Sequence, residues 1–540
     1  MKKYSLETLR SVLAAPFINL PEGKSDWCPR DILINAISTD TRDLKPGSLF
    51  VPLIGERFDG HDYLATAEAR GAVAVLSQYS EAVKKQQLTV PVILVDDTLN
   101  GYRRLAAWYR NQLAGQVIAV SGSVGKTSTR DMIVAALGRM LKVEHTRANL
   151  NNEIGLSGTI LATSEESDAL VVEAGIDGPN QMNRLAEVAQ PNIAVLTMIG
   201  HTHIAQFKTV EGITEEKCKL MNFVKTGGWA LLNGDDPQLC RFLTTWEKSN
   251  DLHLGLVCLG DTIDQSLVGS LHDCSVTVLR GAALDQTAVG TTFDVYLHQD
   301  GDQKGKKLGR VRLTTPGVHH VCNALFGLFC GHILGLDFAD TAAGLMDYKA
   351  TGSRQRIVKS NSVTVVDDSY NASEESMSAG FNLVSTLAEN TGGRFIAALG
   401  GINELGDYSA EIHYRIGTEL YAHHPAAIFL LGDATAELAA GYRAAAARAE
   451  GGNQLNEDDQ HSKQSESLQF FTDVHALSEA IKPILKPGDV LFVKGSHSFG
   501  MEFISEDVIS FLNTDFAGVD NFSKNEDVDP ISAHRIEQEH

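Results

Sequence analysis

The sequence predicts an α/β protein of three domains: a small α/β N-terminal domain, a central P-loop domain with a mainly parallel sheet, and a C-terminal Rossmann-like domain. Three observations support this class. The chain has 540 residues, more than one hydrophobic core usually organises. Short apolar runs alternate with helical patterns, as in parallel sheets covered by helices. An apolar run from Ile118 breaks into a glycine-rich loop at 122–127.

We place the domains at residues 1–97, 98–315 and 316–514. Within the third domain, residues 450–469 are rich in Gly, Asn, Asp, Gln and Ser, a composition that predicts a disordered surface insertion. Residues 515–540 are polar and acidic, and we expect a mobile tail there.

The composition excludes several classes of protein. A net charge of −22 argues against a general nucleic-acid surface. The seven cysteines contain no CxxC pair, which favours reduced thiols over disulfides or a zinc site. No apolar stretch approaches the length of a membrane span, and the first residues resemble an amphipathic helix more than a signal peptide. We expect a cytoplasmic monomer without nucleic-acid or membrane partners.

The N-terminal and central domains follow from the order of their elements. Short strands near 37–39, 48–53, 72–76 and 90–95, with a helix near 63–70, predict the small first domain. A helix near 99–113 links it to the next. Apolar runs at 169–173, 193–197 and 229–233 then predict parallel strands. Between 255 and 313 we expect antiparallel strands added to that sheet, with a turn at 301–307.

The C-terminal domain is predicted from four apolar runs separated by helical patterns. They lie at 363–367, 394–399, 427–431 and 490–494. This alternation is typical of an open parallel sheet of the Rossmann type.

The loop at 122–127 has the residues of a phosphate-binding loop. Gly122 and Gly125 allow backbone N–H groups to face an anion, Lys126 can reach terminal phosphates, and the Thr127 hydroxyl can ligate magnesium. The helix that follows adds its positive end. Val120 stands where the usual motif has its first glycine, so the loop is a shortened variant. A glycine-rich turn that binds no nucleotide is the structural alternative.

Four further features carry candidate chemistry. Glu173 ends a strand, where it can hold magnesium or serve as a solvated cap. His203 follows the strand that ends near 198–200, and it is a candidate metal ligand or an ordinary histidine. Lys217 lies on the apolar side of a helix, where an ammonium is costly unless it is paired, modified or extends to solvent. Residues 367–372 suit a ribose, a metal-bound water or an amine, or form an Asx turn.

Together these motifs resemble the Mur ligases. The resemblance rests on SGSVGKT (121–127), ANLNNEIG (148–155), VEAG (172–175), NGDDP (233–237) and DDSYNA (367–372), with STDTR (38–42) in the first domain and KGSHSFGME (494–502) near the last strand. It covers nearly the whole chain. Their order and spacing are most similar to members that add D-alanyl-D-alanine to UDP-N-acetylmuramoyl-tripeptide.

The resemblance implies an ATP-dependent, ADP-forming ligase of peptidoglycan precursor synthesis, with an acyl-phosphate intermediate and a UDP-sugar-peptide site in the first domain. It implies catalytic roles for Lys126, Lys217 and His203, magnesium ligands at Thr127, Glu173 and His203, and a carbamate on Lys217. ATP contacts are implied for Gly122, Ser123, Val124, Gly125, Lys126, Thr127, Ser128, Asn323, Arg354 and Asp368. Substrate contacts are implied for Ser38, Thr39, Arg42, Asn151, Asn152 and Asn371.

Several positions depart from the family pattern. Val124 replaces a common Asn in the phosphate loop, Ser157 a frequent Pro, and His320 a frequent Asn, while Gly401 replaces an acid. The last change weakens any role for the 399–406 loop, but none removes the lysines, Thr127, Glu173 or His203.

Three alternative functions are compatible with parts of this pattern. A sister ligase would add a single amino acid or build folylpolyglutamate on the same scaffold, but ANLNNEIG and DDSYNA favour the dipeptide enzyme. A kinase or GTPase switch fits less well, because the loop is short and no guanine-recognition motif is present. A non-catalytic scaffold would not need the candidate ligands.

Overall fold

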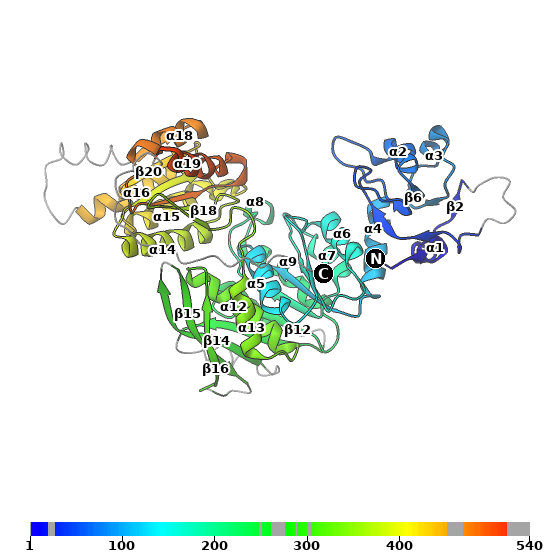
Figure 1. Ribbon diagram of the computed structural model, residues 1–540, viewed down its shortest axis with the longest axis horizontal. Helices are drawn as coiled ribbons and strands as arrows, with labels where there is room; N and C mark the ends of the chain where they lie inside the picture. The colour runs from blue at the N-terminus through cyan, green and yellow to red at the C-terminus, as the bar shows by residue number, and fades with distance from the viewer. Residues whose placement is uncertain are drawn as a thin grey trace, which may run out of the picture.

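The computed structural model describes residues 2–19, 28–247, 251–260, 276–287, 289–299, 302, 304–450 and 468–515. Residues 451–467 of the expected insertion and 516–540 of the expected tail lie outside this part of the chain. The N-terminal and C-terminal domains lie on either side of the central domain (Figure 1). Among the described helices, none is long and apolar enough to cross a membrane.

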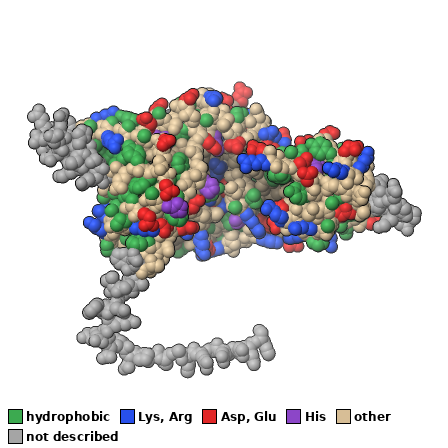
Figure 2. Space-filling model, turned by 90° about the horizontal axis from the view of Figure 1, so that it is seen from above, with side chains coloured by type: hydrophobic (Ala, Val, Ile, Leu, Met, Phe, Trp, Pro, Cys, Tyr) green, Lys and Arg blue, Asp and Glu red, His purple; other side chains and the backbone are tan. Residues whose placement is uncertain are grey.

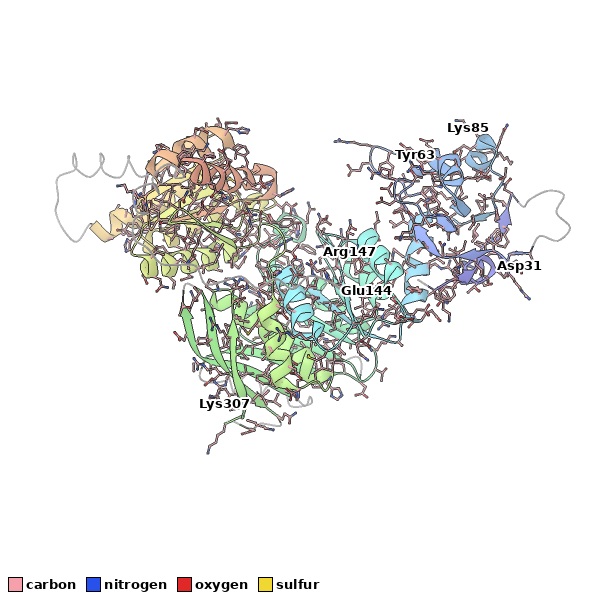
Figure 3. All side chains as sticks on the ribbon, viewed as in Figure 1. Asp31, Tyr63, Lys85, Glu144, Arg147 and Lys307 are labelled. Carbon is pink, nitrogen blue, oxygen red and sulfur yellow. The ribbon has the colours of Figure 1, made fainter. Side chains whose placement is uncertain are left out.

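The N-terminal domain is built on a five-stranded sheet. Its strand order is β2-β7-β6-β5-β4, with β2 (Phe17–Ile18) antiparallel to β7 (Val92–Leu94) and the others parallel: β6 (Ala72–Ser77), β5 (Ser48–Phe50) and β4 (Ala36–Ser38). Helices α2 (Leu64–Ala69) and α3 (Ser80–Gln86) belong to this domain, and β1 (Tyr4–Ser5) pairs with β3 (Leu33–Ile34) beside α1 (Leu6–Leu13). Figure 3 shows Tyr63 and Lys85 at the edge far from the central sheet.

The central domain contains a nine-stranded sheet, of which seven strands are parallel. The parallel strands, in spatial order, are β9 (Val143–His145), β10 (Ala169–Glu173), β8 (Gln116–Ser121), β11 (Ile193–Leu196), β12 (Trp229–Asn233), β13 (His253–Leu259) and β14 (Val276–Thr287). The helices after these strands include α5 (Lys126–Gly138), α6 (Glu153–Ala162), α7 (Met182–Ala189), α9 (Val210–Cys218) and α10 (Pro237–Thr245). The linking helix α4 (Thr98–Arg110) packs on α6 and α7.

The expected antiparallel strands extend this sheet at one edge. Strand β15 (Gly290–His298) pairs with β14 and with β16 (Lys306–Leu313) in antiparallel register, and Lys307 marks that end of the molecule in Figure 3. Helices α12 (Val318–Ile333) and α13 (Phe338–Gly344) pack on α5 and share the core of this sheet. The boundary expected at residues 315 and 316 therefore lies inside the central core, and a division between α13 and β17 (Arg356–Ser360) fits the packing better.

The C-terminal domain is an open sheet in the order β17-β18-β22-β19-β20-β21. Only β17 is antiparallel; the parallel strands are β18 (Val363–Asp367), β22 (Val490–Lys494), β19 (Phe395–Gly400), β20 (Ala427–Leu431) and β21 (Leu468–Phe471). Its helices are α14 (Glu374–Thr391), α15 (Ser409–Ala422), α16 (Thr435–Glu450), α18 (Val474–Ile481) and α19 (Glu502–Asp515). Viewed from above, the molecule is hollowed near its middle, with Lys, Arg and His side chains at the hollow (Figure 2).

Candidate functional site

The phosphate loop joins β8 to α5 in a shape that requires both glycines. Gly122 has φ +148°, and a Cβ there would lie 2.1 Å from Thr197 Oγ1. Gly125 has φ +87° at the N-cap of α5, a conformation that side chains disfavour. The Thr197 hydroxyl donates to the Val124 carbonyl at 2.6 Å, and Ser123 N donates to the Met198 carbonyl at 2.6 Å. The end of the neighbouring strand therefore fixes the loop at the N-terminus of the helix.

Lys126 folds back onto this loop. Its Nζ donates to the carbonyls of Gly122 at 2.8 Å and Ser123 at 3.1 Å. Burial lowers the pKa of Lys126, an effect that Glu173 opposes and Arg354 reinforces. Among the residues that the structure describes, no carboxylate forms an ion pair with this ammonium, and a phosphate at the loop would compensate its charge.

Thr127 and Glu173 lie together at adjacent strand ends. Residues Glu173 and Val120 are partners in the parallel pairing of β10 with β8, and Thr127 Oγ1 donates to Glu173 Oε2 at 3.2 Å. Magnesium has oxygen ligands at about 2.1 Å in octahedral geometry, which places adjacent ligands about 3 Å apart. The hydroxyl and carboxylate thus have the chemistry and spacing to share one magnesium ion.

Arg130 balances the charge of this carboxylate. Both side chains are 1% exposed, and Arg130 NH1 lies 2.7 Å from Glu173 Oε1. The same guanidinium contacts Asp131 at 2.5 Å. Arg130 compensates the charge from the side of Oε1, whereas Oε2 faces Thr127 and also accepts from Asn151 Nδ2 at 3.5 Å.

His203 faces the cleft from the turn before α8 (Ile204–Phe207). It has φ +64°, and its Nδ1 lies against the carboxylate of Glu404 of the C-terminal domain. Burial lowers the pKa of His203; Glu404 opposes this effect, whereas Lys217 and Lys126 add to it. A neutral imidazole is the form that can ligate a metal.

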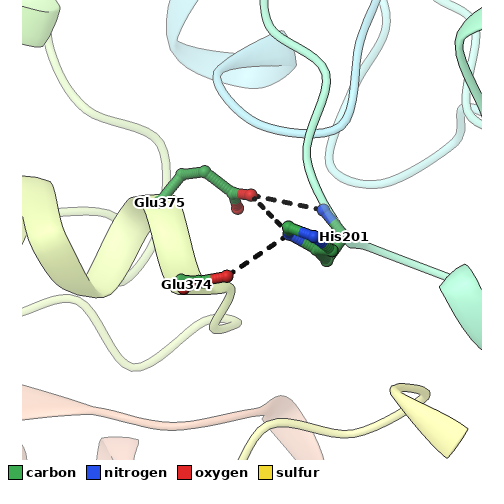
Figure 4. A group of neighbouring side chains, drawn as sticks. All are labelled: His201, Glu374 and Glu375. Atoms are coloured by element: carbon green, nitrogen blue, oxygen red, sulfur yellow. Dashed lines mark hydrogen bonds and ion pairs between the residues drawn. The ribbon is translucent and has the colours of Figure 1, made fainter. Parts of the chain in front are cut away.

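His201 makes a second contact with the C-terminal domain. Its Nδ1 lies 3.3 Å from Glu374 Oε2 and 3.3 Å from Glu375 Oε1 (Figure 4), and the hydrogen bond to Glu375 raises the pKa of His201. A Cβ on Gly200 would lie 2.3 Å from Glu375 Cδ, so glycine is required for this approach. The contact joins the loop after β11 to the first turn of α14.

Lys217 is buried on α9, with 1% of its surface exposed. Burial lowers its pKa well below the ordinary value, and the charge of Lys126 adds to that effect. No hydrogen bond or ion pair reaches its Nζ in the described part of the chain. The helical pattern correctly placed this lysine on the apolar side, and the side chain is buried rather than extended along the surface.

A cleft of about 1140 Å³ lies between the central and C-terminal domains. It collects most of the residues predicted from the sequence. Those lining it are Ser123, Val124, Gly125, Lys126, Thr127, Ser128, Asn151, Asn152, Glu173, His203, Asn323, Arg354, Asp368 and Asn371. Gly122 lies in the loop behind them, and Lys217 lies outside the lining. A smaller cavity of about 210 Å³ shares His203 and Asn371 with the cleft, and Glu404 lines the smaller cavity alone.

Several cleft residues also have structural partners. Asn323 Oδ1 accepts from Thr129 at 2.9 Å, and Asn152 caps α6 through Gly155 N at 2.9 Å. The Arg354 guanidinium stacks 3.5 Å above the Tyr370 ring centroid. These contacts orient the side chains without excluding a ligand.

Asp368 and Lys494 form a buried ion pair at the C-terminal side of the cleft. Their Oδ2 and Nζ atoms are 2.5 Å apart, and Lys494 also donates to the carbonyl of Asn371 at 2.9 Å. Burial raises the pKa of Asp368, an effect that Lys494 opposes. The side chain of Asn371 is exposed, and its Oδ1 accepts from the adjacent Ala372 N at 2.9 Å.

The three residues predicted in the first domain do not join this group. Ser38 ends β4, and its hydroxyl donates to the Asp40 carbonyl at 2.9 Å. The Arg42 side chain is 84% exposed and pairs with Asp40. Neither these residues nor Thr39 line the cleft, so any ligand that contacts both sets must extend between the two domains.

Sequence reasoning assigned no role to Arg130, Glu404, Glu375 or Lys494. Arg130 had one usable signal, since it lies three residues after Thr127 on the same helix and therefore near the same face. The other three reach the site through contacts between segments that are distant in sequence, and no local pattern marks them.

Three family models together match the chain from residue 33 to 497. The Mur ligase family catalytic domain matches 33–152, the Mur ligase middle domain 120–331, and the Mur ligase glutamate ligase domain 353–497. The gap between the last two, residues 332–352, contains α13 and ends just before β17.

Curated relatives match over almost their whole length. A protein from Synechocystis is 32% identical over 501 residues, covering 92% of this chain and 96% of the relative. One from Bacillus subtilis is 32% identical over 478 residues, covering 88% and 93%. Both are named UDP-N-acetylmuramoyl-tripeptide–D-alanyl-D-alanine ligase.

Solved structures share the fold. A crystal structure of MurF from Acinetobacter baumannii superposes with a TM-score of 0.74 at 22% identity, covering 94% of this chain and 99% of that one. MurF from Thermotoga maritima in complex with ADP gives 0.68 at 22% identity, covering 88% and 97%. The predicted three-domain α/β architecture is confirmed.

Proposed function

The chain belongs to the Mur ligase family, and from that premise we propose that it joins D-alanyl-D-alanine to UDP-N-acetylmuramoyl-tripeptide with conversion of ATP to ADP and phosphate. One observation carries the proposal: relatives named for this activity are 32% identical and aligned over 96% and 93% of their length. The cleft supplies matching chemistry, because a phosphate loop and two facing domains surround a space of about 1140 Å³.

The reaction begins with activation of a carboxylate. The terminal carboxylate of the tripeptide attacks the γ-phosphorus of ATP, the bond to ADP breaks, and an acyl phosphate forms. The amine of the dipeptide then attacks the acyl carbon, phosphate leaves, and the nitrogen loses a proton to solvent. Activation is needed because hydroxide is a poor leaving group. Lys126 and the amides of the loop stabilise charge on the transferred phosphoryl group.

Magnesium would be held by Thr127 and Glu173, with His203 as a nitrogen ligand. The 3.2 Å separation of the two oxygen atoms supports this assignment, and the ion would neutralise phosphate charge. Arg130 keeps the buried carboxylate paired when no cation is present.

Lys217 is proposed to carry a carbamate. Only the neutral amine attacks carbon dioxide, and burial beside Lys126 lowers the pKa of Lys217 in that direction. The N–C bond forms with loss of one proton, and the product is an anion. This change would place a negative charge beside the ammonium of Lys126.

The substrates divide among the domains. Ser38, Thr39 and Arg42 would bind the UDP end, while Asn151 and Asn152 would contact the peptide in the cleft. Asn371 would face the incoming dipeptide. ATP would lie on Gly122–Ser128, with Asn323 near adenine and Arg354 and Asp368 closing from the C-terminal domain. We further propose that the protein acts as a cytoplasmic monomer.

The experiment measures phosphate release from ATP in the presence of UDP-N-acetylmuramoyl-tripeptide. We expect release to require D-alanyl-D-alanine and to be absent with single amino acids. Lys126→Ala should abolish release while the circular dichroism spectrum is unchanged. Release driven only by glutamate or a diamino acid would assign a sister ligase, and full activity of Lys126→Ala would refute the role of the loop.

A further inference from the structure

We propose that Glu404 is a positioning residue for the metal site: its carboxylate holds Nδ1 of His203, so that Nε2 is presented to the cation beside Thr127 and Glu173. The C-terminal domain would thereby complete a metal site that otherwise belongs to the central domain. The inference rests on the magnesium site of the proposed function and adds a residue from a different domain to it.

The two nitrogen atoms of His203 have different surroundings. Nδ1 is buried and contacts Glu404. No hydrogen bond to Nε2 is present among the described residues, and His203 lines the cleft that contains Thr127 and Glu173. Histidines that ligate metals commonly donate the other ring N–H to a carboxylate, which fixes the tautomer and the ring orientation. Glu404 places a carboxylate against Nδ1 in the same way, as a close contact rather than a hydrogen bond of regular geometry.

Glu404 is held in place by contacts that do not involve His203. Its backbone has φ +63°, and its carbonyl accepts from Ala205 N at 3.2 Å. The two residues before Glu404 are also held by hydrogen bonds. Asn403 N donates to Ser496 Oγ at 2.9 Å, and Ile402 N donates to His413 Nε2 at 3.0 Å. The side chain is 56% exposed, but the loop that carries it is fixed to the C-terminal sheet. The acid is therefore presented to His203 by the fold.

The positive charge in the cleft explains why a carboxylate beside His203 would favour metal binding. His203 lies near Lys126, whose positive charge acts against a cation at the same place. A carboxylate on the far side of the ring makes the imidazole a stronger electron donor and offsets part of that repulsion. In the described part of the chain, Glu404 is the acid in contact with this ring.

Other contacts near His203 also join the central and C-terminal domains. His201 pairs with Glu374 and Glu375, and the Tyr408 hydroxyl donates to the carbonyl of Lys208 at 3.0 Å. These contacts would dock the C-terminal domain even without Glu404. Removing the Glu404 carboxylate should therefore change metal binding more than it changes domain docking.

The test uses the full-length protein with Mn²⁺ as the probe, in the presence of a non-hydrolysable ATP analogue. Mn²⁺ affinity is measured by electron paramagnetic resonance, and pulsed spectra report coupling to an imidazole nitrogen. We expect this coupling in the wild type and its loss in His203→Ala. Glu404→Ala should raise the Mn²⁺ dissociation constant at least about tenfold, and Glu404→Gln should have a smaller effect because an amide oxygen still accepts a hydrogen bond.

Glu411→Gln is the matched control, because Glu411 is an exposed acid on the same domain that pairs with Arg415. It should leave Mn²⁺ affinity within twofold of the wild type. If the wild type shows no imidazole coupling, the metal role of His203 fails, and the present inference fails with it. If the coupling is present and Glu404→Ala keeps both affinity and coupling, only the role of Glu404 is refuted. Thermal unfolding of each variant reports a purely structural effect.

Discussion

Replacing Arg130 by methionine removes the cation that faces Glu173 inside the central domain. Both side chains are 1% exposed and the pair is 2.7 Å apart, so solvent cannot compensate the carboxylate that remains. Removing one partner of a buried ion pair lowers the free energy of unfolding by about 3–5 kcal/mol. Arg139→Met gives a matched control near the end of the same helix: its pair with Asp347 is 46% and 58% exposed, and loss of such a pair costs at most about 1 kcal/mol.

Urea unfolding followed by tryptophan fluorescence measures both variants with and without Mg²⁺ and an ATP analogue. Without magnesium, Arg130→Met should be less stable than the control by at least about 2 kcal/mol. Saturating magnesium should restore part of the loss, since a ligand at a hundred times its dissociation constant stabilises the folded state by about 2.7 kcal/mol. Equal stability of the two variants, or no response of Arg130→Met to magnesium, would refute the reasoning.

Three further results are expected. With ¹³C-bicarbonate, the wild type should show a carbamate carbon signal by NMR that is absent from Lys217→Met; equal spectra would contradict the carbamate. Burial lowers the pKa of His319 to about 4. As the pH falls below 6.5, this histidine therefore takes up a proton in the unfolded state before it does so in the folded state. The free energy of unfolding should decrease by up to about 3 kcal/mol between pH 6.5 and 4. This decrease should be smaller in His319→Gln. Gly122→Ala would place Cβ 2.1 Å from Thr197 Oγ1 and should weaken ATP binding in calorimetry, whereas Gly138→Ala, with no atom within 4 Å of the new Cβ, should not.

The three-sheet architecture was predictable because its signals are local. Most strands of the parallel sheets are short apolar runs, and the glycines of the phosphate loop mark one strand end. Two strands were missed: β9 is Val-Glu-His, and β21 begins within the segment predicted to be a disordered insertion. The neighbourhood of Glu173 and Thr127 also followed, because carboxyl ends of parallel strands share one edge. The domain boundary did not follow, since the apolar pattern of α12 shows that the helix is buried but not which sheet buries it.

The contacts between domains were beyond sequence reasoning for a different reason. Glu404 reaches His203 across about two hundred positions of chain, a distance over which a single sequence carries no pairing signal. The departure at Gly401 even argued against a role for that loop. Arg130 was closer to prediction, because helical spacing places it near Thr127, but its pairing with Glu173 depends on the strand order of the sheet.

The central claim is that the phosphate loop activates a carboxylate by phosphoryl transfer. It is tested most directly by labelling the terminal carboxylate of the UDP-N-acetylmuramoyl-tripeptide with ¹⁸O and analysing the inorganic phosphate by mass spectrometry after ligation of D-alanyl-D-alanine. An acyl phosphate transfers one carboxylate oxygen to phosphate, so the account predicts one ¹⁸O per phosphate released. Phosphate that carries no label while the amide product forms would contradict it.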